Sequence, residues 1–197
     1  KMKITIFTSN RLRHNYFIQE MNKICDELFV FQESVSLFPG KYSDIYGKSQ
    51  VIEDYFISVK EAEKKIFKNN FIKTEKTFFL KNMLANDLKY LNFSDYKNFF
   101  NSDIYVVFGS SFIKGWLIDF LIEHKAINIH MGLSPYYRGS SCNFWALYDN
   151  NPNHVGATIH LLSKGLDSGE ILFHCVPKPY RNENLFDFTM KSVKLSH

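Results

Sequence analysis

The fold is decided by the run DIYVVFGSSFIKGWLIDFLIEHKAINIH, which spans Asp103–His130. It opens with Asp103–Gly109, a short apolar segment rich in β-branched residues that ends in glycine, as is typical of a buried strand. The stretch Trp116–His124 has an apolar face at helical spacing, and Ala126–His130 is again strand-like. A strand, a helix and a second strand in succession indicate parallel neighbours in an open α/β sheet.

The same pattern is found on both sides of this run. Lys3–Thr8 and Phe29–Gln32 are predicted strands, and Asn15–Leu28 is the predicted helix between them, with Asn15 as a candidate cap, because its apolar residues recur at three- and four-residue steps. Towards the C-terminus the sequence predicts a short helix, two strands and the glycine-containing turn that joins those strands: Asn143–Tyr148, His154–Leu162, Glu170–Val176 and Lys164–Gly169.

Three segments are less regular. Residues 39–47 are rich in turn formers. Residues 49–101 are charged and aromatic and indicate two or three helices on one side of the sheet, with Glu61–Lys65 facing solvent. Residues 182–197 predict a terminal helix or a frayed end. The expected fold class is α/β, with a mostly parallel central sheet flanked by helices.

Composition limits the classes of function. With 197 residues, of which 45% are hydrophobic, the chain can form one domain with a substantial core. The formal net charge is +4, and the lysines are scattered rather than clustered. This distribution disfavours nucleic-acid binding, but it allows a small anionic substrate, which needs only a few well-placed cations.

The cysteines and the N-terminal segment favour a cytoplasmic protein without a membrane anchor. Cys25, Cys142 and Cys175 are far apart and form no CxxC pair, so we expect neither a disulfide framework nor a zinc knuckle. Lys1–Phe7 is too short and too strand-like for a signal peptide. No apolar run reaches the roughly 18 residues that a membrane span needs.

A polar pair stands at the end of the strand Ala126–His130. Asn128 and His130 are two positions apart, so their side chains face the same side of the sheet, at the edge where open α/β sheets build their sites. An amide and a protonated imidazole provide two donors for a developing oxyanion. Asp167, flanked by Gly165 and Gly169, is the candidate carboxylate that would orient the imidazole and manage its proton.

These residues fall within four short motifs: Asn128–His130 (NIH), Gly132–Gly139 (GLSPYYRG), Gly156–His160 (GATIH) and Asp167–Ile171 (DSGEI). In this order and spacing the motifs resemble those of the 10-formyltetrahydrofolate-dependent formyltransferases, the family of glycinamide ribonucleotide transformylase and methionyl-tRNA formyltransferase. Gly132 and Ser134 depart from the Ser-Leu-Leu of the family's loop. The resemblance implies a Rossmann-like formyltransferase fold, with residues 1–180 as the catalytic domain and 181–197 as a C-terminal tail.

The resemblance also implies how the residues share the chemistry. An amine would attack the formyl carbon of 10-formyltetrahydrofolate, Asn128 and His130 would stabilise the tetrahedral oxyanion, and Asp167 would orient His130. No metal is implied, and His154, His160 and His174 lack a recognised ligand spacing. The residues expected beside the folate are Gly109, Ser111, Phe112, Ile113, Lys114, Leu162, Gly165 and Leu166. For Phe112 and Ile113, core packing is an equal alternative, and His160 could line the site or pack in the sheet.

The acceptor amine is less well defined. Thr8–Asn15 contains no glycine where glycinamide ribonucleotide transformylases carry a glycine-rich phosphate loop, and the chain ends too soon after Pro177 for a tRNA-binding domain. A nucleotide-linked amino sugar is therefore the leading acceptor. The candidate substrate-binding residues are Arg11, Arg13, His14, Tyr137, Arg138, Gly139 and Trp145.

Other functions stay open at this point. Water could be the acceptor, which would make the protein a 10-formyltetrahydrofolate hydrolase, and the purine-pathway transformylase is a further alternative. A non-catalytic folate- or nucleotide-binding module would carry the same motifs without turnover. Either a monomer or a homodimer fits the sequence.

Overall fold

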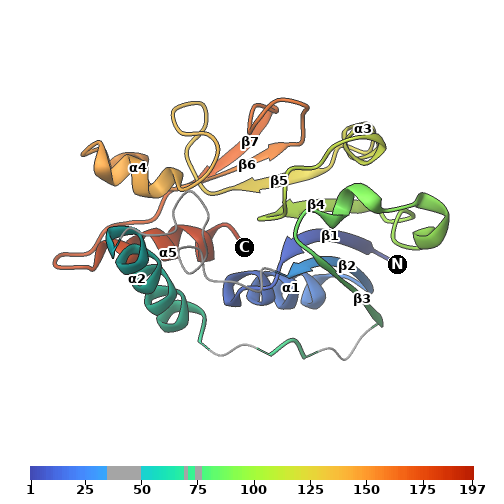
Figure 1. Ribbon diagram of the computed structural model, residues 1–197, viewed down its shortest axis with the longest axis horizontal. Coiled ribbons are helices and arrows are strands. Elements are labelled where there is room, and N and C mark those ends of the chain that lie inside the picture. The colour runs from blue at the N-terminus through green and yellow to red at the C-terminus, as the bar shows by residue number, and fades with distance from the viewer. Residues whose placement is uncertain (35–49, 69–70, 74–76) are drawn as a thin grey trace.

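The computed structural model describes residues 1–34, 50–68, 71–73 and 77–197. Within these ranges the centre is a seven-stranded sheet in the order β3-β2-β1-β4-β5-β6-β7 (Figure 1). The strands are β1 (Lys3–Ser9), β2 (Glu27–Ser34), β3 (Thr77–Leu84), β4 (Ile104–Phe108), β5 (Ile127–His130), β6 (Ala157–Leu161) and β7 (Ile171–Cys175). Strands β1 to β5 pair in parallel, whereas β6 pairs antiparallel with both β5 and β7. The predicted α/β class with a mostly parallel sheet is confirmed.

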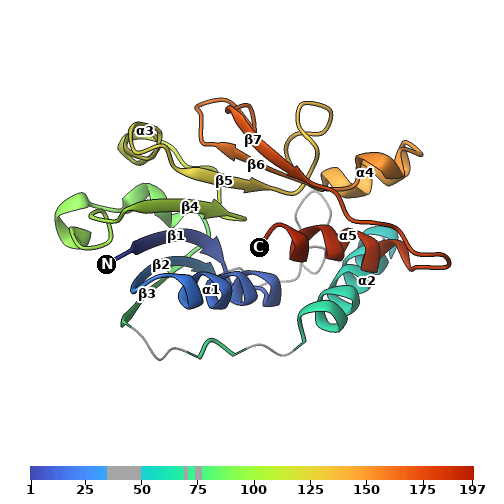
Figure 2. The ribbon, with the colours of Figure 1, turned by 180° about the vertical axis from the view of Figure 1, so that it is seen from behind.

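Helices cover both faces of the sheet. They are α1 (Leu12–Ile24), α2 (Gln50–Phe67), α3 (Trp116–Glu123), α4 (Cys142–Tyr148) and α5 (Leu185–Leu195), with the short 3₁₀ helices η1 (Asp87–Tyr90), η2 (Phe93–Tyr96) and η3 (Pro152–His154). Seen from behind, α1 lies against the β1–β2–β3 part of the sheet, and α5 lies beside α2 (Figure 2). Met190 and Val193 of α5 belong to the main core.

Alternate residues of the central strands fill two separate cores. Ile6 and Val106 belong to the core that α1, α2 and α5 cover, and Phe7 and Val107 belong to the core under η1, η2 and α3. Because successive strand residues point to opposite faces, a strand that is buried on both faces is mainly apolar. The buried polar side chains in these strands are few, and Thr5 and Thr8, for example, are hydrogen-bonded to backbone carbonyls. This is why β1, β2 and β4 were recognisable from short apolar runs.

The first helix differs from its prediction, because it spans Leu12–Ile24 rather than Asn15–Leu28. Arg11 is the N-cap residue, and its backbone N–H donates to Nδ1 of His14. Asn15 does not cap the helix, since its side-chain oxygen accepts a hydrogen bond from Gln32. Leu28 lies in β2 and pairs with Ile4. The apolar pattern continues from helix to strand without a break, so periodicity alone misplaced the helix end.

The prediction for residues 49–101 was partly wrong. The described part of this segment contains one α-helix, α2, followed by the strand β3 and the 3₁₀ helices η1 and η2. β3 was missed because Lys81 and Asn82 interrupt its apolar residues. As the edge strand it also leaves several side chains exposed, including Phe79 and Leu84. Within Glu61–Lys65, Glu63 is buried rather than solvated. The turn predicted over residues 39–47 lies outside the described residues.

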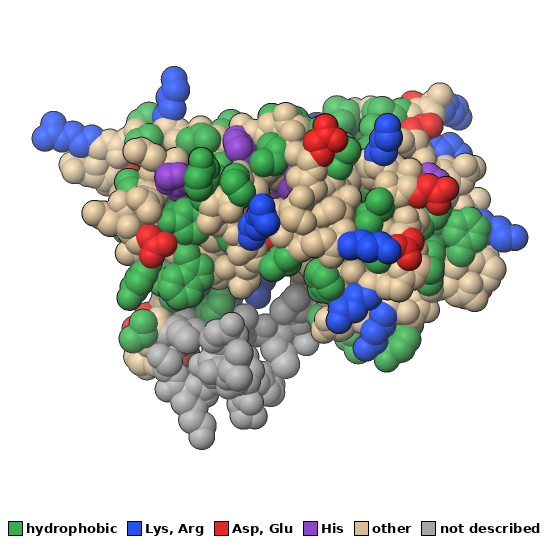
Figure 3. All heavy atoms as spheres, turned by 90° about the horizontal axis from the view of Figure 1, so that it is seen from above, with side chains coloured by type: hydrophobic (Ala, Val, Ile, Leu, Met, Phe, Trp, Pro, Cys, Tyr) green, Lys and Arg blue, Asp and Glu red, His purple; other side chains and the backbone are tan. Residues whose placement is uncertain are grey.

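The order of the strands determines where a site can form. The chain passes from β1 to β2 and β3 on one side and then returns to β4 on the other, so the carboxyl ends of β1 and β4 form a switch point, where open α/β sheets bind ligands. No helix of the described ranges is long and apolar enough to cross a membrane. On the face shown in Figure 3, the described Lys and Arg side chains are interspersed with acidic and hydrophobic ones.

Candidate active site

A pocket of about 460 Å³ lies at this switch point. We call it the donor pocket. Asn128, His130 and Asp167 all line it, as do Gly109–Ile113 from the loop after β4 and Leu162–Leu166 from the loop after β6. Three sequence segments that are far apart in the chain therefore meet at one edge of the sheet.

Asp167 is the centre of the polar cluster. Its Oδ2 lies 3.2 Å from Nδ1 of His130 and accepts a hydrogen bond of 2.9 Å from the backbone N–H of Gly139. Its Oδ1 accepts a hydrogen bond of 3.1 Å from Nδ2 of Asn128. The predicted trio is thus in direct contact through the carboxylate of Asp167.

The turn that carries Asp167 depends on its neighbours. Asp167 has a positive φ of 44°, and its carbonyl accepts a hydrogen bond from the Ser134 hydroxyl. A Cβ atom on Gly169 would lie 1.7 Å from the carbonyl oxygen of Leu161, so any side chain there would force the turn away from β6. The close approach expected of the glycines beside Asp167 is found at Gly169.

The pKa of His130 is lower than a protonated imidazole at neutral pH would require. Burial lowers the pKa of His130, although the Asp167 carboxylate and the Tyr137 carbonyl oppose that effect. Burial alone would raise the pKa of Asp167, but the nearby His160 and His130 and the Gly139 N–H outweigh it and lower that pKa. The lowered pKa of His130 favours the neutral imidazole. In that form one of the two ring nitrogens faces its acceptor oxygen, on Asp167 or Tyr137, without a proton.

The donors of the site are engaged with one another. The second ring nitrogen of His130, Nε2, lies 2.9 Å from the Tyr137 carbonyl oxygen. Nδ2 of Asn128 also lies 2.9 Å from Nε2 of His160, whose Nδ1 faces the Leu161 carbonyl oxygen at 2.8 Å. A formyl oxygen that binds here must exchange with one of these partners, which is common for catalytic hydrogen bonds before substrate binds.

His160 both lines the site and packs in the sheet, the two positions that the sequence allows. It is buried, it lines the donor pocket, and it is paired directly with Asn128 across the antiparallel β5–β6 ladder. The sequence signal for a site role of His160 was the Gly156–His160 motif. The strand that carries this motif, β6, pairs with β5 and so brings His160 alongside Asn128.

The loop after β4 is held from behind by a residue that the sequence analysis did not identify. Glu33, at the end of β2, accepts hydrogen bonds from both the backbone N–H and the hydroxyl of Ser111. Ser111 therefore lines the pocket with both of its donors already used. Ile113 is buried in the core as well as lining the pocket, and Phe112 is 59% exposed. Lys114 does not line the pocket, and its Nζ lies 5.5 Å from the centre of the Phe112 ring.

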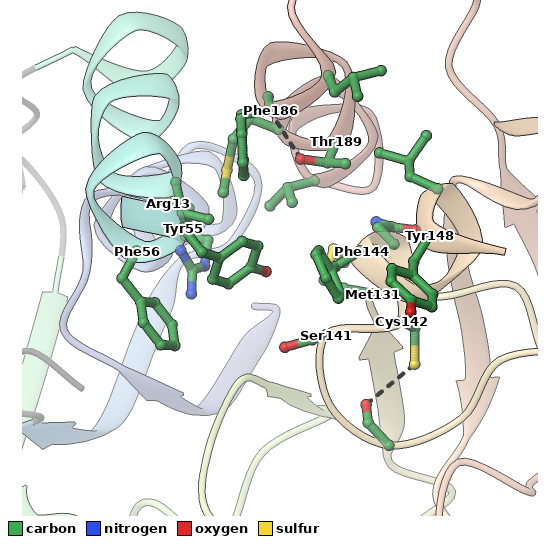
Figure 4. A pocket seen from close by; sticks show the side chains of 17 residues that line it. Arg13, Tyr55, Phe56, Met131, Ser141, Cys142, Phe144, Tyr148, Phe186 and Thr189 are labelled. Atoms are coloured by element: carbon green, nitrogen blue, oxygen red, sulfur yellow. Dashed lines mark hydrogen bonds between the residues drawn. The ribbon is translucent and has the colours of Figure 1, made fainter. Parts of the chain in front are cut away.

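A second pocket, of about 420 Å³, lies between α2, α4 and α5 (Figure 4). We call it the aromatic pocket, because Tyr55, Phe56, Phe144, Tyr148 and Phe186 are among the described residues that line it. The two pockets share Arg13, Met131 and Gly139. They meet beside the catalytic candidate His130, since Cys142 lines the aromatic pocket and its Sγ lies 3.6 Å from Nε2 of His130.

Of the candidate substrate-binding residues, Arg13 and Gly139 line both pockets, and His14 lines the donor pocket. Burial holds the pKa of His14 well below its usual value, so it is a neutral side chain. Arg13 forms an ion pair of 3.1 Å with Glu63. The remaining candidates line neither pocket: Arg11, Tyr137, Arg138 and Trp145.

Tyr137 and Trp145 have other contacts in the structure. Tyr137 contributes its backbone carbonyl to His130, and its hydroxyl contacts Asp149 and Asn151. Trp145 is 49% exposed and packs against Phe144. Sequence spacing near the Arg-Gly turn could not separate residues that face the site from those that face away from it.

Cys142, His154 and His174 lie outside the polar trio. Burial raises the pKa of Cys142 to about 11, so it is a thiol at neutral pH and donates towards the Gly139 carbonyl. His154 lies in η3 rather than in a strand, and His174 contacts the Ser134 carbonyl. Within the described ranges, no group of three or more His, Cys, Asp or Glu side chains has the arrangement of a metal site.

The fold and the site together define an α/β protein with an Asn-His-Asp cluster at the carboxyl edge of its sheet, an arrangement suited to acyl-type group transfer. Comparison with known proteins is consistent with this class. The formyl transferase family model matches residues 58–189, and the chain belongs to that family.

A relative matched by sequence agrees with this membership. Formyltetrahydrofolate deformylase 2, mitochondrial, of Arabidopsis thaliana is 35% identical over 85 residues, which are 43% of this chain and 24% of that protein. The match therefore spans about a quarter of the relative's length.

Solved structures share the fold. Phosphoribosylglycinamide formyltransferase from Streptococcus pneumoniae has a TM-score of 0.60 at 16% identity, over 100% of this chain and 93% of that one. A sugar N-formyltransferase from Shewanella sp FDAARGOS_354 has a TM-score of 0.55 at 16% identity, over 99% and 65%. The predicted Rossmann-like formyltransferase fold is confirmed.

Proposed function

We propose that this chain is an N-formyltransferase that moves the formyl group of 10-formyltetrahydrofolate to the primary amine of a small anionic substrate. The leading acceptor is an amino sugar carried on a nucleotide. The observation that carries this proposal is the meeting of two pockets beside His130. A hydrolase needs room for the folate and a water molecule, whereas a transferase needs a second pocket for the body of the acceptor.

In the proposed mechanism, the amine nitrogen attacks the formyl carbon, and the electron pair of the C=O bond moves to the oxygen. Nδ2 of Asn128 donates to this oxyanion by exchanging one of its present partners. The proton lost by the amine passes through water to the neutral imidazole of His130, and the Asp167 carboxylate stabilises the imidazolium that forms. His130 is therefore the base as well as an oxyanion neighbour.

The intermediate then collapses. The C=O bond re-forms, the bond from carbon to N10 of the folate breaks, and N10 takes the proton from His130. The products are tetrahydrofolate and the N-formyl amine, and no metal or external oxidant is needed. The donor pocket would hold the pterin beside the loops that contain Phe112 and Leu162–Leu166, where apolar side chains can pack on its ring.

The acceptor would occupy the aromatic pocket. Its aromatic lining suits a sugar or a base, because flat rings pack on aromatic faces. Arg13 lines both pockets and pairs with Glu63. A cation shared by the two pockets supports an acceptor with an anionic group. We further propose that residues 1–180 form the catalytic domain, that the enzyme works in the cytoplasm on small molecules, and that it can form a homodimer.

The decisive experiment is a formyl-transfer assay. Purified protein is incubated with 10-formyltetrahydrofolate and a panel of nucleotide-linked amino sugars, and both tetrahydrofolate and the formylated product are measured. We expect tetrahydrofolate to appear only when an accepted amine is present, in equal amount to the N-formyl product. Release without any amine would identify a hydrolase. Folate binding without turnover for any amine, glycinamide ribonucleotide included, would identify a binding module.

A further inference from the structure

Glu33 is a buried carboxylate behind the donor pocket. It lies near the carboxyl end of β2, next to β1 in the sheet, and its side chain is only 2% exposed. It is not one of the residues that line the pocket. A buried carboxylate is costly unless its oxygens are hydrogen-bonded, so its contacts indicate what it does.

Within the described part of the chain, its three hydrogen bonds all come from neutral donors. Oε2 accepts from the backbone N–H of Ser111 at 2.5 Å, and Oε1 accepts from the Ser111 hydroxyl at 2.6 Å. Oε1 also accepts from the backbone N–H of Asn86 at 2.8 Å. Two acceptor oxygens are needed for this set, because the Ser111 donors approach different oxygens. A glutamine side chain offers only one.

These bonds fix the loop Gly109–Ile113, which lines the donor pocket, at Ser111. Gly109 begins the loop with a positive φ of 65°, Ser111 is bound to Glu33, and Ile113 is buried in the core. Phe112 lies between the two anchored residues and is exposed on the pocket side. The bond to Asn86 also ties the loop to the turn that follows β3.

We propose that Glu33 is a positioning residue for the formyl donor: it presets the loop Gly109–Ile113 for the pterin without touching it. This inference rests on the proposed function, because it assumes that the donor pocket receives the folate. A loop that is already ordered loses less conformational freedom on binding, so the effect of Glu33 falls on folate affinity rather than on the chemical step.

The first test is Glu33→Gln. The new NH2 group must face a donor on Ser111 or Asn86, so at least one hydrogen bond is lost and a donor-donor contact replaces it. We expect the Kd for tetrahydrofolate, measured by calorimetry, and the KM for 10-formyltetrahydrofolate to rise about tenfold or more. The kcat at saturating donor and the KM for the acceptor should stay near the wild-type values.

Matched variants separate positioning from general damage. Ser111→Ala removes one of the three bonds and should raise the folate Kd by less than Glu33→Gln does. Asp103→Asn alters a carboxylate at the opposite edge of the sheet, which accepts the Lys3 N–H at 2.7 Å, and should leave the folate Kd unchanged.

The outcomes distinguish this inference from the proposed function. If the wild-type protein does not bind tetrahydrofolate, the proposed function fails. If the wild type binds and a folded Glu33→Gln protein binds equally well, the positioning role is overturned while the proposed function stands. If Glu33→Gln does not fold, Ser111→Ala decides, and a folate Kd equal to that of the wild type would overturn the role.

Discussion

Nδ1 of His130 lies 3.2 Å from Oδ2 of Asp167, and the same carboxylate oxygen accepts the Gly139 backbone N–H. One carboxylate thus fixes both the ring of the proposed base and the start of the segment that leads into α4. Because Oδ1 accepts from Asn128 as well, a change at Asp167 reaches every member of the proposed catalytic set.

Replacing Asp167 with Asn should therefore cost more than one hydrogen bond. The amide keeps the shape but removes the charge that stabilises the His130 imidazolium during proton transfer. We expect kcat to fall by about 10²- to 10⁴-fold, with the circular dichroism spectrum unchanged. The measurement is steady-state formyl transfer with both substrates saturating. A variant that kept more than half of the wild-type kcat would exclude Asp167 from the mechanism.

The pH dependence of kcat follows from the pKa of His130. Burial lowers this pKa, and the proposed base works in its neutral form, so activity should rise with pH through a midpoint below 6.5 and level off near neutrality. The Asp167 carboxylate opposes the lowering, so the residual activity of Asp167→Asn should have its acid limb at a still lower pH. An acid limb that stays in place in this variant would point to another group as the base.

His130→Ala and Asn128→Ala test the two residues separately. Loss of the proton acceptor should reduce kcat by about 10²- to 10⁴-fold, and loss of the amide donor by about 10²- to 10³-fold. Because the two act on one intermediate, the double variant should lose less than the product of the two single losses. If the loss in the double variant equalled the product of the two single losses, or if the folded single variants kept the wild-type kcat, the two residues would not act on one intermediate.

Much of the fold was predictable because the central strands are buried on both faces. Strands such as β4 and β1 have no solvent-facing side, and because residues such as Val106 and Val107 alternate between two cores, most positions are apolar. β3 was not predictable in this way. It is an edge strand with exposed side chains such as Phe79 and Leu84, and Lys81 and Asn82 interrupt its apolar residues. The end of α1 was misplaced because Leu28 continues the helical pattern by chance.

The polar trio was predictable and its supporting residues were not, for a physical reason. Asn128 and His130 are local neighbours on one strand, and Asp167 lies in a turn with a recognisable motif. Glu33 acts across 78 residues of chain, and a single acidic residue at a strand end has no local signature. The aromatic pocket likewise joins α2, α4 and α5, which only the tertiary structure brings together.

Gly169→Ala should be severely destabilising. The added Cβ would lie 1.7 Å from the Leu161 carbonyl oxygen, and backbone on both sides must move to relieve that overlap. We expect a loss of at least about 3 kcal/mol in the free energy of unfolding, measured by urea denaturation. Gly165→Ala is the matched control in the same loop, because its Cβ would meet the Ser168 hydroxyl, which can rotate away. Equal losses for the two variants would refute the close approach.

Phe144→Ala tests whether the aromatic pocket holds the acceptor. Phe144 and Tyr55 both line this pocket, and their ring centres lie 5.0 Å apart. Removal of the Phe144 ring takes away packing surface there, and Phe144 does not line the donor pocket. We expect the KM for the acceptor to rise on the order of tenfold, while the KM for 10-formyltetrahydrofolate stays the same. Trp145→Ala is the control, since Trp145 is the next residue of α4 and lies outside the pocket. If both variants raised the acceptor KM equally, or if Phe144→Ala raised the donor KM instead, the acceptor would have to bind elsewhere.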